Sequence, residues 1–168
     1  MGVKKFVLDD NVVNEIITAV KETFFHSLSE EIEFVSTQDA LEREFDFYGI
    51  VGLEQFENDN YSEGFLKCEF KKDLVFYILK KLYQREIDDI DRSSIHCAGE
   101  FTNIIYTRVK SNLNEKLGYA FKMAVPAVTL DCEDKAFAIT SGPCVDKIIN
   151  FKVKDLPFCV HVKIKDGE

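Results

Sequence analysis

The sequence predicts a single α+β domain covering residues 1–168, in which helices cover an antiparallel sheet. Three segments have apolar residues at helical spacing, and several shorter segments have the aromatic and β-branched composition of strands. No linker, internal repeat or low-complexity tract divides the 168 residues. A chain of this length can bury a core without help from disulfides or metal ions.

Three segments are expected to form helices. Residues 9–26 begin with the N-capping residues Asp9, Asp10 and Asn11 and continue with apolar residues one turn apart. Residues 72–84 and 92–116 form the second and third helices. The third has an apolar side, made of Ile95, Ala98, Phe101, Ile105, Val109 and Leu113, and a polar side, made of His96, Glu100, Asn103 and Thr107.

The expected strands cover residues 31–36, 45–53, 64–70, 122–130, 136–140, 147–153 and 158–164. A turn at residues 58–60 joins the second and third of these as a hairpin. Gly49 and Gly52 indicate a bulge or the close approach of another element. Pro126 lies within the fourth segment. Because proline has no N–H group, an edge position or a bulge is expected there.

The composition is that of an ordinary globular protein, with 46% hydrophobic and 30% charged residues. The net charge of −9 opposes binding to phosphate backbones, so nucleic acid is not an expected partner. No apolar run reaches membrane-spanning length and no signal-peptide core follows the N-terminal lysines, so we expect a cytoplasmic protein that binds no membrane. The five cysteines form no Cys-x-x-Cys pair, and we expect buried, reduced thiols.

The motif with the most chemical content is Glu100-Phe101-Thr102-Asn103, followed after 22 residues by Pro126. On a helix, Glu100 and Asn103 are neighbours on one face. A carboxylate accepts hydrogen bonds from a cation, and a carboxamide both accepts and donates. Together they can grip a lysine and hold a water in line with a phosphoryl group, without a nucleophile from the protein itself.

This pattern resembles that of the CheC/CheX/FliY phosphatases of bacterial chemotaxis. Their signature is a helical Glu-x-x-Asn followed 22 residues later by Pro, which Glu100, Asn103 and Pro126 match in identity and spacing. Residues 98–104 resemble the CheX form of that helix, and the glycine pattern of residues 49–64 resembles the first hairpin of the family. CheC-type members carry two such motifs and this chain carries one, which points to CheX.

The resemblance implies a CheC/CheX-like fold with the motif on a long central helix. It also implies an enzyme that removes the phosphoryl group from the aspartyl phosphate of a CheY-like response regulator. Asn103 would orient the attacking water, Glu100 would contact the regulator's active-site lysine, and Pro126 would be structural. His96 and Thr107 would lie at the rim of the contact. The chain would bind no cofactor or metal, because the regulator supplies the Mg²⁺. CheX-type proteins also form homodimers by sheet extension.

Two alternatives to catalysis remain open. A CheX-like module that only binds a receiver domain is favoured by His96, which stands where the family usually has Asp or Ser. A structural flagellar-switch component like FliY is the other, although such proteins carry an additional domain. A Cys-His hydrolase is not expected, because Cys97 and His96 are adjacent on the helix and point about 100° apart.

Overall fold

The structure, a computed structural model, describes residues 4–38, 44–57, 60–130 and 143–165. Within these residues the elements follow the order α1 (Asp10–Leu28), β1 (Glu33–Gln38), β2 (Phe47–Glu57), β3 (Asn60–Phe70), α2 (Lys72–Tyr83), α3 (Arg92–Leu117), β4 (Ala127–Thr129), β5 (Cys144–Val153) and β6 (Leu156–Lys165). The three expected helices are confirmed, with ends that differ by at most two residues. The expected strand at 136–140 lies outside the described residues.

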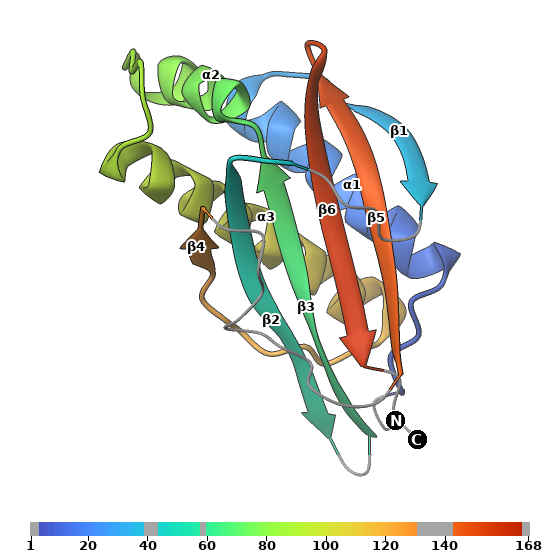
Figure 1. The fold of residues 1–168 in the computed structure, drawn as a ribbon. Helices are drawn as coiled ribbons and strands as arrows, with labels where there is room; N and C mark the ends of the chain where they lie inside the picture. The colour runs from blue at the N-terminus through green and yellow to red at the C-terminus, as the bar shows by residue number, and fades with distance from the viewer. Residues whose placement is uncertain (1–3, 39–43, 58–59, 131–142, 166–168) are drawn as a thin grey trace.

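The described strands form one sheet in the order β1-β5-β6-β3-β2-β4, and every neighbouring pair is antiparallel. The expected hairpin is confirmed as β2 and β3, which pair along their whole length. The helices gather on one face of the sheet, with α1 and α2 each packed against α3 (Figure 1). The α+β fold class with an antiparallel sheet is therefore confirmed.

The expected strand at residues 122–130 is largely wrong. Only β4 is a strand there, and residues 119–126 have no regular secondary structure. Met123 and Val125 are 85% and 86% exposed, so these apolar side chains do not pack on a face of the sheet. Pro126 directly precedes β4 and cannot donate a ladder hydrogen bond. The expected edge position is confirmed within the described sheet, where β4 pairs only with β2.

Helix α3 has clear signals at both ends. Asp91 is the N-cap, and its side chain accepts a hydrogen bond from the Ser94 backbone N–H at 3.0 Å. The Ser94 hydroxyl lies 2.9 Å from the Asp91 backbone N–H, which completes a capping box. Gly118 ends the helix with φ of 78°, a left-handed conformation that glycine adopts without strain. The 26 residues between these caps form the long helix that the sequence predicted.

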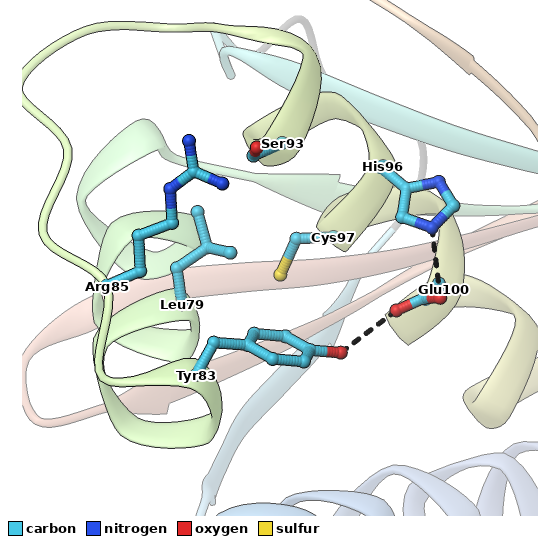
Figure 2. A pocket seen from close by; sticks show the side chains of 7 residues that line it. All are labelled: Leu79, Tyr83, Arg85, Ser93, His96, Cys97 and Glu100. Carbon is cyan, nitrogen blue, oxygen red and sulfur yellow. Dashed lines mark hydrogen bonds and ion pairs between the residues drawn. The ribbon is translucent and has the colours of Figure 1, made fainter.

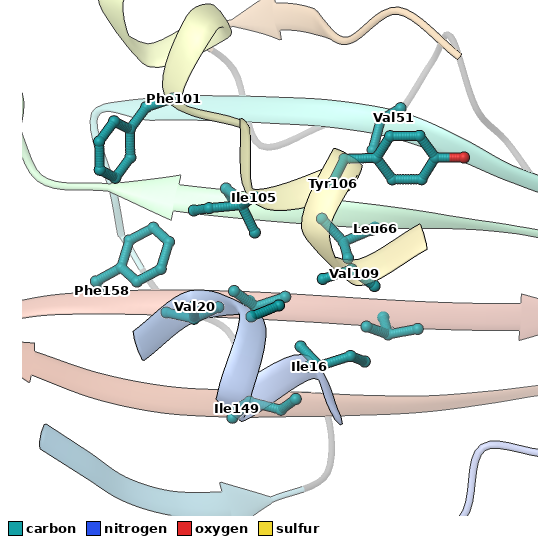
Figure 3. Close-up of a cluster of buried hydrophobic side chains, with 14 of the residues drawn as sticks. Ile16, Val20, Val51, Leu66, Phe101, Ile105, Tyr106, Val109, Ile149 and Phe158 are labelled. Atoms are coloured by element: carbon teal, nitrogen blue, oxygen red, sulfur yellow. The ribbon is translucent and has the colours of Figure 1, made fainter. Parts of the chain in front are cut away.

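The core lies between the helices and the inner face of the sheet (Figure 3). Phe101, Ile105 and Val109 of α3 are buried there, as the apolar side of that helix predicted. The other side chains labelled in the figure are Ile16, Val20, Val51, Leu66, Tyr106, Ile149 and Phe158. The position of α3 over the sheet is thus set by its apolar side, which leaves its polar side facing outward.

Two further expectations concern cysteines and membranes. Cys68, Cys97 and Cys159 are buried, as expected, whereas Cys144 is only half-buried. Cys132 lies outside the described residues. No helix in the described part of the chain has the length and apolar character needed to cross a membrane.

Candidate functional site

The polar side of α3 carries the candidate site. His96, Glu100, Asn103 and Thr107 are all exposed on successive turns, as their spacing predicted. The intervening Phe101 and Thr102 are buried against the sheet. Since the inner residues are packed, the helix cannot rotate about its axis. The Glu100 and Asn103 side chains are therefore presented together on a rigid element.

The Glu100 carboxylate is held by two other side chains (Figure 2). The Tyr83 hydroxyl donates to Glu100 Oε2 at 3.0 Å, and His96 Nε2 lies 3.0 Å from Glu100 Oε1. Tyr83 is the last residue of α2, whereas His96 is one turn earlier on α3. The pKa of Tyr83 is raised mainly by the hydrogen bond to Glu100 and to a smaller extent by burial. The phenol therefore stays a neutral donor at physiological pH.

A pocket of about 310 Å³ lies beside this cluster, between the end of α2 and the first turns of α3. It is lined by Leu79, Tyr83, Arg85, Ser93, His96, Cys97 and Glu100 (Figure 2). The Cys97 thiol and the Leu79 side chain contribute apolar surface, and Arg85 contributes a cation. His96 lines one side of this pocket, and its side chain is 73% exposed.

Asn103 lies one turn further along the helix. Within the described part of the chain, no hydrogen bond engages its exposed carboxamide. Strand β4, which follows Pro126, flanks this face, because the Val128 Cγ2 atom lies 3.0 Å from a Cβ built on Gly99. Asn103 therefore keeps its donor and acceptor groups available to a partner, whereas Glu100 is already partly engaged.

The geometry does not support a cysteine nucleophile. Burial raises the pKa of the Cys97 thiol to about 12, with a further contribution from the Glu100 charge. His96 directs Nε2 to Glu100 rather than to the thiol. Because the thiolate is the reactive form, Cys97 is inert at neutral pH. This agrees with the prediction that no Cys-His hydrolase is present.

No group of three or more His, Cys, Asp or Glu side chains is arranged to hold a metal ion among the residues that the structure describes. Acidic residues between α2 and α3 are spread along an exposed connection. One of them, Asp91, is used as the N-cap of α3.

Sequence reasoning missed one residue of this cluster. Tyr83 lies 17 positions before Glu100 and is separated from it by the connection between two helices. No local pattern distinguishes it from other tyrosines at helix ends. The contact exists only because α2 and α3 pack side by side.

Comparison with known proteins adds independent information on this architecture. No protein-family model and no curated protein sequence matches the chain. Similar solved structures include a CheC-like superfamily protein from Shewanella sp. PV-4, with a TM-score of 0.78 and 19% identity, covering 95% of this chain and all of that one. The chemotaxis protein CheX from Vibrio vulnificus has a TM-score of 0.76 and 17% identity, covering 92% of this chain and 99% of that one.

This chain has the CheC/CheX fold. CheX in the CheX–CheY–BeF₃–Mg²⁺ complex from Borrelia burgdorferi is also similar, with a TM-score of 0.69, 21% identity and coverage of 92% of this chain and 98% of that one. The similarity spans nearly the whole of each chain. The CheC/CheX fold predicted from the motif is therefore confirmed well beyond the residues that carry the sequence resemblance.

Proposed function

We propose that this chain is a CheX-type member of the CheC/CheX/FliY family and removes the phosphoryl group from a CheY-like response regulator. The observation that carries the proposal is the exposed Glu100 and Asn103 pair on α3, in a chain with the CheC/CheX fold. The Borrelia burgdorferi CheX of similar fold was crystallised with CheY, BeF₃ and Mg²⁺, which supports a receiver domain as the partner.

The proposed chemistry needs little from this chain. A water attacks the phosphorus atom in line with the aspartyl oxygen, the new P–O bond forms, and the aspartate carboxylate leaves. A carboxylate is a good leaving group, so no general acid is required. The receiver domain contributes the Mg²⁺ that neutralises charge on the phosphoryl oxygens. The remaining need is a group that fixes the direction of the water.

Asn103 is suited to that task, because its carboxamide is exposed and not otherwise engaged within the described residues. Its oxygen accepts a hydrogen bond from the water and its NH₂ donates to a phosphoryl oxygen. Glu100 has a different role. Its carboxylate would pair with the ammonium of the receiver's active-site lysine, which docks the two proteins and sets their register.

The test is single-turnover decay of a phosphorylated CheY-like receiver at saturating concentrations of this chain. Asn103→Ala should slow decay by about 10²–10³-fold, which corresponds to roughly 3–4 kcal/mol for the loss of one preorganised polar group. Glu115→Ala, an exposed change near the far end of α3, is the matched control and should leave the rate unchanged. Binding to the beryllofluoride form of the receiver should be similar for both variants.

Equal decay rates for wild type and Asn103→Ala, with both proteins folded and bound, would remove Asn103 from the chemistry. That result would favour the second candidate function, a CheX-like module that binds a receiver without catalysis. The observation in its favour is the contact of His96 with Glu100, since one carboxylate oxygen is already engaged before any partner arrives.

A further inference from the structure

The Glu100 carboxylate is the only exposed acidic group among the described residues of α3 that two other side chains of this chain hold from different directions. Tyr83 donates to Oε2 and His96 lies against Oε1, each at 3.0 Å. The side chain of Glu100 is nevertheless 49% exposed, so a partner can still reach it. An exposed Glu with no such contacts would sample several rotamers and lose that freedom on docking.

Of the two contacts, Tyr83 is the one that is always a hydrogen-bond donor near neutral pH. It is the last residue of α2, a helix that packs into the core through the buried residues Leu74, Val75, Ile78 and Leu79. Its hydroxyl remains protonated and can always donate. His96 lies on α3, but its ring nitrogen donates only in one tautomer or when protonated.

The contacts leave room for a third donor. A carboxylate has about four lone-pair sites, two on each oxygen. Tyr83 uses one site on Oε2 and His96 uses one on Oε1. At least one site on each oxygen is thus available to an ammonium group. The two contacts fix the direction of the carboxylate without occupying all of its acceptor capacity.

We propose that Tyr83 is a positioning residue that holds the Glu100 carboxylate in the orientation that accepts the lysine ammonium of the receiver. This inference rests on the proposed function. Tyr83 touches neither the phosphoryl group nor the water, and it acts through Glu100 alone. Preordering Glu100 lowers the entropic cost of docking, so its effect belongs to binding rather than to the chemical step.

The experiment compares Tyr83→Phe with wild type in single-turnover decay over a range of chain concentrations. Loss of one hydrogen bond to a carboxylate should raise the half-saturating concentration about three- to tenfold. The maximal rate should stay within about twofold, since Asn103 is unchanged. In the Glu100→Ala background, Tyr83→Phe should have no further effect, because the group that it positions is missing.

Tyr77→Phe is the matched control. Tyr77 is on the same helix and also donates to a glutamate, Glu30, which lies away from the site. This variant should lower the melting temperature and leave the half-saturating concentration unchanged. Tyr83→Phe, in contrast, should leave the melting temperature unchanged and raise the half-saturating concentration.

Several outcomes would overturn the inference. An unchanged half-saturating concentration for Tyr83→Phe would remove the positioning role, and the proposed catalysis would stand if Asn103→Ala still slows decay. An equal loss of affinity with and without Glu100 would assign Tyr83 a structural role. Tighter docking by Tyr83→Phe would show that Tyr83 competes with the receiver for Glu100. A different pair of results would separate the two proposals. If Tyr83→Phe weakens docking only when Glu100 is present, while Asn103→Ala is fully active, the positioning role stands and the proposed mechanism is refuted.

Discussion

Gly49 of β2 lies directly against Thr102 of α3. A Cβ built on Gly49 would come within 2.0 Å of the Thr102 Oγ1 atom and 2.8 Å of its Cβ. Thr102 directly precedes Asn103 in the sequence motif, and its buried hydroxyl donates to the Ala98 carbonyl at 2.7 Å. Gly49 therefore sets how closely the helix that carries the motif approaches the sheet. The close approach predicted from this glycine is confirmed.

Gly49→Ala should push α3 away from β2 and destabilise the fold by about 2–3 kcal/mol, the usual cost of overpacking. Urea denaturation of the two proteins measures this change. The helix would also shift at the motif, so receiver decay should slow even where the variant is fully folded. Thr102→Ala removes the closest atom, and the double variant should be more stable than the sum of the single effects predicts. Strictly additive losses would contradict the proposed contact.

Glu100→Ala should affect docking and turnover together, unlike Asn103→Ala. The carboxylate contributes charge pairing with a lysine and also sets the register of the two proteins. We expect a higher half-saturating concentration and a lower maximal rate in the same decay assay. Glu115→Ala, at an exposed position near the other end of α3, serves as the charge-matched control. A loss of affinity with an unchanged maximal rate would confine Glu100 to docking.

Glu30 lies just after α1 and contacts residues of both α2 and the turn between β5 and β6. It accepts hydrogen bonds from Lys81, at 2.7 Å, and from Tyr77, and Lys154 lies at 3.5 Å. The Lys81 hydrogen bond is the largest cause that lowers the pKa of Glu30 to about 2, followed by the Tyr77 bond. Its ordinary pKa is 4.5. The folded chain therefore binds a proton at Glu30 less readily than the unfolded chain does.

The stability contributed by Glu30 should be fully present above about pH 4.5 and lost as the pH falls toward 2. Glu30→Gln should lower the free energy of unfolding at pH 7 by about 1 kcal/mol, because the ion pairs are partly exposed. It should also flatten the acid limb of stability against pH, measured by urea denaturation between pH 7 and pH 3. The exposed Glu115→Gln change should alter neither quantity. An unchanged acid limb in Glu30→Gln would exclude this linkage.

We expect a homodimer in solution, since the resemblance to CheX implies one. Strands β1 and β4 are the edges of the described sheet, where a second copy could extend it. Sedimentation equilibrium or light scattering at micromolar concentrations measures the mass directly. A monomeric mass at every concentration would refute the dimer and leave the proposed phosphatase activity unaffected.

The purified chain should hold no stoichiometric zinc or iron, whereas decay of the receiver phosphate should require Mg²⁺. Elemental analysis tests the first expectation. Addition of EDTA to the decay assay tests the second, and should stop turnover without changing the melting temperature of this chain. A tightly bound transition metal in each chain would require a different account of how the water is activated.

Much of the fold and the motif face followed from the sequence, because the signals involved are local. The spacing of Phe101, Ile105 and Val109 defines the inner side of α3. The same periodicity places Glu100 and Asn103 together on the outer side. The pairing of β2 with β3 as a hairpin was also predictable, since its signals lie within one short stretch of the chain.

Only the tertiary structure decided which distant groups meet this face. Tyr83 contacts Glu100 because α2 and α3 pack together. Thr102 packs directly on Gly49, where a larger residue would clash with it. Residues 122–126 are not a strand despite their apolar composition, because among the described strands none forms a ladder with them beyond the hydrogen bond from Lys122 N–H to the Glu54 carbonyl of β2. Such contacts depend on the packing of elements far apart in the chain, and no periodicity within one element records them.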